Sequence, residues 1–463
     1  MGPDLTARMR IDKGAPGEIV YRVAEGAGWR DLLTVSVNET FALYELASDM
    51  SHVLAISSRG RDRAALVQVD LSDGSETVLV EEPDEDIFDI VDFTRHDGQI
   101  DAVLTHVGDS GIIPLTPRGE TVAQIVADMP GRVEVEALNW SGDGRFVAAS
   151  LSPDAKGYET YVLDLDTGTA DHLGTHSFRD RYGDDLADTQ EVTIPARDGM
   201  ALHALLVRPK GVSGPVPTVI EVHGGPAQHL IWQYHRFRQF LANRGYAVLA
   251  VNFRGSTGFG KAYQAAGFGQ AGRAMQDDLV DAANWAVAQG IADPDALAIN
   301  GGSYGGYAAA MAMVRDPGLF AAAIVEHAVL DLPYQMRNNP NAWNLTPEYM
   351  VRYFGDPDDA EDLEAMRDRS PITHVDRLEA PVLMVAGKRD RIVGFEQTEA
   401  FVRAAEDAGK QVETLIFEDE GHGLDRWQSN IRYARRVEDF LATHLGGRSG
   451  GWDWIEIAAE TLD

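Results

Sequence analysis

Short apolar runs alternate with longer stretches of helical spacing through the second half of the chain. Arg197-Asp198-Gly199 separates two of the apolar runs in the manner of a hairpin turn, which we expect at the entry to a sheet. Buried parallel strands joined by helices produce such an alternation, so the pattern predicts a doubly wound α/β sheet over residues 186–445. The expected strands are 192–194, 202–207, 218–222, 247–252, 296–300, 321–325, 382–386 and 412–417, and the expected helices are 275–288, 395–408 and 431–445.

The residues before about position 190 follow a different pattern. A turn, a short strand, a polar hairpin and a second strand recur in three stretches that begin at Ser48, Asp97 and Ser141. Such repeats are typical of β-propeller blades of about 40 to 50 residues, of which roughly three or four would fit into residues 1–185. Because a closed propeller usually has roughly 4 to 8 blades, we expect this domain to be short or incomplete. An irregular antiparallel β domain is the alternative.

The most informative motif of the chain is Gly301-Gly302-Ser303-Tyr304-Gly305-Gly306. An apolar run precedes it and a helix-forming segment follows it, which is the strand, sharp turn and helix of a nucleophile elbow. The glycines leave room where a Cβ would clash with the tightly bent backbone. We therefore predict that Ser303 is a catalytic nucleophile, which requires a histidine base and an orienting carboxylate.

Asp390 and His422 are the candidates for these two partners. Asp390 follows the apolar run of the strand expected at 382–386, and His422 lies between two glycines after the last expected strand. The chain order serine, aspartate, histidine is that of the α/β-hydrolases and differs from the orders in chymotrypsin and subtilisin. Asp419 and Glu420 remain alternatives for the acid.

A second glycine-rich loop, His223-Gly224-Gly225-Pro226, follows the strand expected at 218–222. A glycine here brings its backbone N–H close to a developing oxyanion, so we predict that Gly225 and Tyr304 form the oxyanion hole. His223 and Arg254 are predicted to be structural residues that hold this loop.

Together these motifs resemble the prolyl oligopeptidase family of serine peptidases, and most closely its acylaminoacyl-peptidase and dipeptidyl-peptidase-like branch. The resemblance covers roughly residues 190–445. It implies that Ser303, Asp390 and His422 are catalytic, that Gly225 and Tyr304 donate to the oxyanion, and that a propeller limits access to short peptides. The motifs are His-Gly-Gly-Pro at 223–226, Asn-Phe-Arg-Gly-Ser-Thr-Gly-Phe-Gly at 252–260, Gly-Gly-Ser-Tyr-Gly-Gly at 301–306, Ser-Pro-Ile at 370–372 and Asp-Glu-Gly-His-Gly at 419–423.

One loop departs from the family pattern. The family usually shows x-Arg-Val-Pro after its catalytic aspartate, whereas Asp390 is followed by Arg391-Ile392-Val393-Gly394.

These residues predict a serine peptidase that hydrolyses short peptides through an acyl-enzyme, without a metal or an organic cofactor. One alternative is a carboxylesterase with the same triad, because the scaffold does not choose between amides and esters. Another is a peptide-binding module without catalysis, against which the intact serine, aspartate and histidine argue.

The charge of the chain excludes some partners. With 40 basic and 73 acidic residues, the formal net charge is −33, which repels nucleic-acid phosphates and anionic lipids. The acidity indicates either a well-solvated surface or attraction of cationic peptides. Cysteine is absent, so neither disulfides nor thiolate chemistry can contribute. Neither a signal-peptide core nor an apolar run of membrane-spanning length is found, so we expect a cytoplasmic protein.

Residues 446–463 form a tail in which a glycine-rich linker leads to Trp452 and Trp454. Either this tail docks on a neighbouring surface or it is a disordered end. An incomplete propeller would leave sheet edges exposed, so we expect a homo-oligomer that covers them.

Overall fold

The structure is a computed structural model of the 463-residue chain. It describes residues 7–47, 49–87, 92–96, 99–104, 111–338, 347–451 and 453–461. By its contacts the chain divides into two compact units. Unit 1 comprises Met1–Asp184 and Thr257–Ala265, and unit 2 comprises Asp185–Ser256 and Ala266–Asp463. The domain boundaries that we predicted from the sequence, and the propeller assignment of the first domain, stay predictions.

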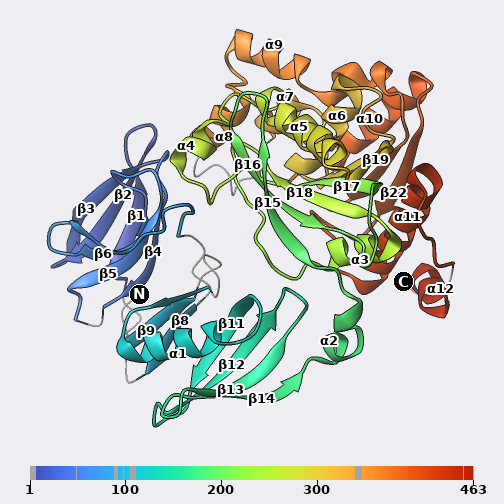
Figure 1. Cartoon of the computed structure of the whole chain (residues 1–463). Helices are drawn as coiled ribbons and strands as arrows, with labels where there is room; N and C mark the ends of the chain where they lie inside the picture. The colour runs from blue at the N-terminus through green and yellow to red at the C-terminus, as the bar shows by residue number, and fades with distance from the viewer. Residues whose placement is uncertain are drawn as a thin grey trace. The chain divides into compact units, whose positions relative to one another are not determined.

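The described part of unit 1 contains four small antiparallel sheets, which appear in blue and cyan in Figure 1. Apolar clusters hold them, and the sheet formed by residues 41–80 buries both of its faces: Val53 and Val67 lie in one cluster, and Ile56 and Leu66 lie in another. The predicted all-β character of this region is confirmed, although Ser48, Asp97 and Gly98 of the repeats lie outside the described residues. The sheets are β1 Met9–Lys13, β2 Glu18–Glu25 and β3 Gly28–Ser36; β4 Phe41–Leu46, β5 His52–Ser57, β6 Ala65–Asp70 and β7 Glu76–Val80; β8 Asp92–His96, β9 Gln99–Leu104 and β10 Ile112–Pro114; and β11 Val133–Trp140, β12 Phe146–Pro153, β13 Glu159–Asp164 and β14 Thr169–Thr175.

Helices add to unit 1 at three places. Helix α1 spans Pro117–Ala127, begins at the N-cap Thr116 and buries Val122, Ile125 and Val126 against the sheet of β8–β10 and the sheet of β11–β14. Helix α2 spans Ser177–Tyr182 and is followed by a short 3-10 helix at Gly183–Asp185, and α4 spans Lys261–Ala265.

Unit 2 is built on one eight-stranded sheet of order β15-β16-β18-β17-β19-β20-β21-β22. In the hairpin of β15 and β16, the strand β16 pairs antiparallel with β18. The six strands β18, β17, β19, β20, β21 and β22 are parallel to one another. The predicted α/β fold is confirmed, and each expected strand falls on an observed one. These are β15 Thr189–Pro195, β16 Ala201–Val207, β17 Val216–Val222, β18 Ala247–Asn252, β19 Ala292–Gly302, β20 Ala322–Glu326, β21 Val382–Gly387 and β22 Val412–Phe417.

Helices cover both faces of this sheet. Figure 1 shows α5, α6 and α10 on the opposite side of the sheet from α3 and α11. The helices expected at 275–288 and 395–408 are observed, whereas the last one begins at Trp427, four residues ahead of the expected start at 431. Three of the four added residues, Gln428, Ser429 and Asn430, are polar, so the first turn shows no helical repeat of apolar residues that would reveal it. The helices are α3 Arg236–Arg244, α5 Ala274–Ala288, α6 Tyr304–Arg315, α7 Leu332–Arg337, α8 Pro347–Phe354, α9 Ala360–Asp368, the 3-10 helix Pro371–Arg377, α10 Phe395–Asp407, α11 Trp427–Leu445 and α12 Trp454–Thr461.

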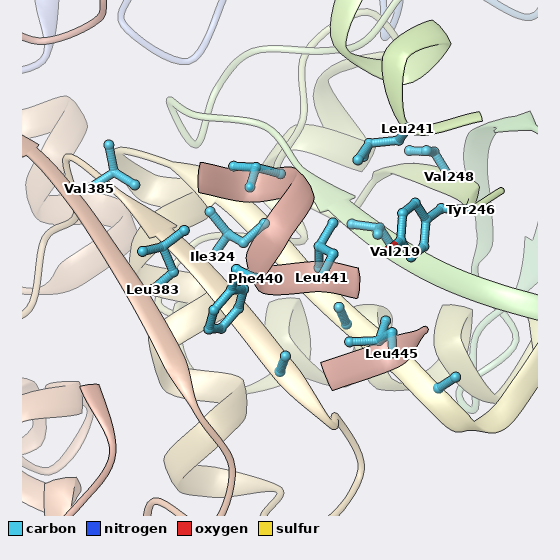
Figure 2. Close-up of a cluster of buried hydrophobic side chains, with 14 of the residues drawn as sticks. Val219, Leu241, Tyr246, Val248, Ile324, Leu383, Val385, Phe440, Leu441 and Leu445 are labelled. Carbon is cyan, nitrogen blue, oxygen red and sulfur yellow. The ribbon is translucent and has the colours of Figure 1, made fainter. Parts of the chain in front are cut away.

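The core on one face of the sheet lies between the strands and the helices α3 and α11 (Figure 2). Val219 of β17, Ile324 of β20 and Leu383 of β21 meet Leu241 of α3 and Leu441 of α11 in this cluster. Their burial fixes the sheet beneath the loops at the carboxyl ends of its strands, where ligands bind in open α/β sheets.

The described part of the tail docks on its own chain. The Tyr246 hydroxyl donates to the Gly446 carbonyl at 2.5 Å, and Arg435 of α11 donates to the Gly451 carbonyl at 3.0 Å. Helix α12 packs against α11, while Trp454 itself is 76% exposed. Trp452 lies outside the described residues. Backbone and ionic contacts thus hold the tail, and the Trp454 ring does not.

Among the helices that the structure describes, none combines the length and the apolar character needed to cross a membrane.

Candidate active site

Ser303 stands at the turn between β19 and α6. Its backbone has φ 58° and ψ −117°, a conformation that costs a non-glycine residue roughly 1–3 kcal/mol. A Cβ on Gly301 would lie 2.7 Å from the carbonyl oxygen of Val222, and one on Gly305 would overlap the same oxygen. The strand β17 therefore approaches the turn so closely that only glycine fits two residues before and two residues after Ser303. This is the geometry of a nucleophile elbow.

Asp390 and His422 are brought together from the loops after β21 and β22. His422 Nδ1 lies 2.7 Å from Asp390 Oδ2, and the amides of Ile392 and Val393 donate to Asp390 Oδ1 at 2.8 and 2.9 Å. Burial alone would raise the pKa of Asp390, but the hydrogen bonds from His422 and the two amides lower it below its usual value. Asp390 is therefore an ionised carboxylate that holds the proton of His422 on Nδ1 and leaves Nε2 as the basic atom.

The two other candidate acids have different partners. Asp419 pairs with Arg389 and Arg426. The carboxylate of Glu420 is buried and accepts hydrogen bonds from the amides of Asp425 and Arg426, ahead of α11. Neither carboxylate is hydrogen-bonded to His422 within the described part of the chain, so the geometry favours Asp390.

The predicted oxyanion donors lie beside Ser303. Gly225 has φ +117°, which favours glycine, and a Cβ on the preceding Gly224 would lie 3.5 Å from the Cβ of Ser303. Tyr304 is the first residue of α6, where backbone N–H groups have no partner within the helix. The loop 223–226 and the start of α6 thus lie beside Ser303, and the oxyanion-binding role of Gly225 and Tyr304 stays a prediction.

His223 and Arg254 hold the surrounding backbone. The buried His223 ring donates from Nδ1 to the Gly224 carbonyl at 2.7 Å and stacks on Phe253. Burial lowers its pKa to about 4, so it is neutral at pH 7. The Arg254 guanidinium donates three hydrogen bonds to the buried carboxylate of Asp278 and pairs with Asp198 at 2.7 Å. These contacts agree with the structural roles that we predicted.

A small pocket opens beside the serine. The loops before α7 and the helices α7 and α8 supply most of its wall, and sequence patterns alone did not reveal it. Its side chains are mainly apolar and are drawn from segments far apart in the sequence. Besides Gly225, Ser303 and Tyr304 it is lined by Tyr307, Val329, Leu332, Gln335, Met336, Met350 and Phe354.

A second histidine, His327, lies near the Asp390–His422 pair. Its Nδ1 is 3.7 Å from Asp390 Oδ2, and its ring packs edge-on against the ring of His422, with the centroids 5.7 Å apart. The sequence analysis missed this residue because a lone histidine after an apolar run carries no motif. The available signal was its position directly after β20, because β20 and β21 are adjacent parallel strands and end at the same edge.

The segment of Glu326 and His327 connects the serine to the pair. The Ser303 amide donates to the Glu326 carbonyl at 2.9 Å, and the next residue, His327, contacts His422. Among the hydrogen bonds of the described residues there is none between Ser303 and His422. In unliganded sites this bond is often long and forms only with substrate.

Comparisons with known proteins place this geometry in a family. Residues 232–448 match the prolyl oligopeptidase family. Over 459 residues the chain is 33% identical to dipeptidyl aminopeptidase BIII of Pseudoxanthomonas mexicana, a match that covers 96% of this chain and 65% of the relative. Residues 232–448 belong to the prolyl oligopeptidase family. The resemblance that we inferred from the motifs is thereby confirmed.

Further relatives extend the same comparison. Dipeptidyl peptidase family member 6 of Caenorhabditis elegans is 28% identical over 491 residues, which cover 96% of this chain and 65% of that protein. The chain thus spans slightly less than two thirds of the length of both curated relatives.

Solved structures show the same fold. A puromycin hydrolase superposes with a TM-score of 0.78 at 24% identity, over 98% of this chain and 70% of that one. An acylaminoacyl peptidase of Pyrococcus horikoshii superposes with a TM-score of 0.71 at 17% identity. The match covers 96% of this chain and 69% of that one.

Proposed function

We propose that the chain is a serine peptidase that hydrolyses short peptides. The observation that carries the proposal is the strained Ser303 turn, which the Glu326–His327 segment connects to a histidine already paired with a buried carboxylate. Membership of residues 232–448 in a peptidase family and relatives named as dipeptidyl aminopeptidases support the choice of peptides as substrates.

In the proposed reaction Ser303 Oγ attacks the peptide carbonyl carbon while His422 Nε2 accepts the hydroxyl proton. The N–H groups of Gly225 and Tyr304 bind the oxyanion, and Asp390 stabilises the imidazolium that forms. His422 then protonates the leaving amine, and a water molecule hydrolyses the acyl-enzyme with His422 acting again as base. These groups need neither a metal nor an organic cofactor.

The pocket beside Ser303 suggests which side chain precedes the scissile bond. Val329, Leu332, Met336, Met350 and Phe354 present an apolar wall to it. Burying an apolar side chain there contributes about 25 cal/mol per Å² of apolar surface. We therefore propose that an apolar residue occupies this pocket when the adjacent carbonyl lies at Ser303.

Peptide substrates separate this function from esterase activity. We expect peptide p-nitroanilides with an apolar residue before the amide to be cleaved, and folded proteins to be spared. Simple esters should react as well, because an ester has a better leaving group than an amide. The measurement is initial-rate hydrolysis across a diverse peptide library, with Ser303→Ala as the blank. Ester turnover without cleavage of any library peptide would favour the carboxylesterase, and no turnover of either would favour a binding module.

We also propose that the chain forms a homo-oligomer, as the sequence predicted. Apolar side chains stand exposed on edge strands of unit 1, with Ile11 on β1 at 59% exposure and Leu173 on β14 at 63%. Multi-angle light scattering at micromolar concentration should give more than one chain per particle. Leu173→Glu should weaken association if this edge is the interface, whereas deletion of residues 446–463 should not. A monodisperse, active monomer would contradict the proposal.

The proposed cellular compartment is the cytoplasm, and it rests on the sequence alone.

A further inference from the structure

The peptidase reaction leaves His327 without a role. Its side chain is 8% exposed, and its backbone has φ +45°, which non-glycine residues seldom adopt. Within the described part of the chain its Nδ1 is buried and has no hydrogen-bond partner. Buried polar atoms are nearly always paired, so this nitrogen is a candidate ligand atom.

The unpaired nitrogen points to a set of metal-binding atoms. His327, Asp390 and His422 each offer one ligand atom, and these three atoms lie within 4.8 Å of one another. Asp390 Oδ2 is 3.7 Å from His327 Nδ1 and 2.7 Å from His422 Nδ1. Zinc–ligand bonds of about 2.0–2.2 Å place tetrahedral ligands roughly 3.3–3.5 Å apart, so these atoms need to move by less than about 1 Å.

The surroundings favour zinc over other common cations. Two imidazole nitrogens and one carboxylate oxygen suit Zn²⁺, whereas Mg²⁺ and Ca²⁺ take oxygen ligands. The second oxygen of Asp390 is held by the amides of Ile392 and Val393, which fixes the carboxylate as a ligand.

We propose that His327, Asp390 and His422 form an inhibitory zinc site, with a water molecule as the fourth ligand. The regulatory part of this proposal rests on the peptidase function proposed above. Zinc on His422 Nδ1 takes the place of the proton that this atom shares with Asp390. A neutral imidazole keeps one N–H, so the proton moves to Nε2. The atom that should accept the Ser303 proton is then already protonated, and acylation stops.

Zinc binding to the full chain, freed of metal with a chelator, tests the site by isothermal titration calorimetry. We expect the wild type to bind one Zn²⁺ per chain and Mg²⁺ not to bind. His327→Asn should weaken zinc binding by more than about tenfold, because loss of even an outer-shell partner typically costs roughly 10- to 100-fold in affinity. Asparagine suits this position because it tolerates positive φ. His422→Gln is a second variant with the same expected loss.

His374→Asn is the matched control. His374 Nε2 also lies 3.7 Å from an aspartate oxygen, Asp368 Oδ1, but it is not part of a three-ligand cluster among the described residues. This variant should bind zinc as the wild type does. Equal zinc affinity in the wild type and in both His327→Asn and His422→Gln would overturn the proposal.

Inhibition is measured for the wild type, His327→Asn and His374→Asn as the rate of each protein in zinc divided by its own rate in chelator. Zinc should suppress the wild type and His374→Asn, and His327→Asn should need more than about tenfold more zinc for the same suppression. Unchanged peptide hydrolysis by a zinc-saturated wild type would overturn the inhibitory role.

Ser303→Ala separates this proposal from the peptidase proposal. It retains all three ligands and should bind zinc like the wild type. If it does so, and His327→Asn does not, the zinc site stands even for a chain that cleaves no peptide, and the peptidase proposal alone fails.

Discussion

Replacement of Ser303 by alanine is expected to abolish both labelling by a fluorophosphonate probe and hydrolysis of peptides. Loss of the nucleophile of a serine hydrolase lowers kcat by about 10⁶-fold, because the base and the acid cannot act without it. The substitution should leave folding intact, since alanine keeps a Cβ of the same size at the strained backbone position. The measurements are in-gel fluorescence of the labelled protein and initial rates on the peptide that is cleaved best.

Ser213→Ala is the control for this experiment. Ser213 is an exposed serine in the loop before β17, so its loss should change neither labelling nor hydrolysis. Mass spectrometry of the digested, labelled wild type should place the probe on Ser303 alone. Labelling that persists in Ser303→Ala would show that another residue is the nucleophile.

Asp390→Asn is expected to lower kcat by about 10⁴-fold with little loss of stability. The side-chain oxygen of asparagine can still accept from the amides of Ile392 and Val393, so the loop should keep its conformation. Its NH₂ group would face His422 Nδ1 and force the proton of the ring onto Nε2, which leaves no base for Ser303. Steady-state kinetics and a thermal melt separate the two effects.

Two further carboxylates provide the comparison. Asp419→Asn should retain nearly normal kcat, because Asp419 pairs with arginines and does not contact His422. Glu420→Gln should mainly lower the melting temperature, with little change in kcat. The Glu420 carboxylate accepts two backbone N–H groups ahead of α11, so its role is to hold this loop. Near-normal kcat in Asp390→Asn together with a large loss in either of the others would reassign the acid.

Local sequence carried most of the information on the nucleophile. The bend at Ser303 needs glycines within two residues of the serine, and this requirement is visible in the sequence as a fixed spacing. The strands beneath the site were predictable for a similar reason, since a strand buried on both faces must be a continuous apolar run. The start of α11 was placed four residues late because three of the first four residues of this helix are polar and show no apolar repeat.

The choice of the acid needed the tertiary structure. Asp390, Asp419 and Glu420 all precede His422 in the sequence, and all lie in loops near strand ends. Only the hydrogen bond to His422 Nδ1 distinguishes Asp390, and that bond joins residues 32 positions apart on loops from neighbouring strands.

The sequence by itself determined the α/β class of the second half, the Ser303 turn and His422 as the base that we expect to serve it. These features depend on steric contacts between residues close in sequence and on the regular spacing of buried apolar residues. Both are visible as local patterns in the sequence. The tertiary structure alone decided the partner of His422, the pocket beside Ser303 and the position of His327. Each of these depends on which strand ends meet at one edge of the sheet, and strand order is set by packing between segments far apart in the chain.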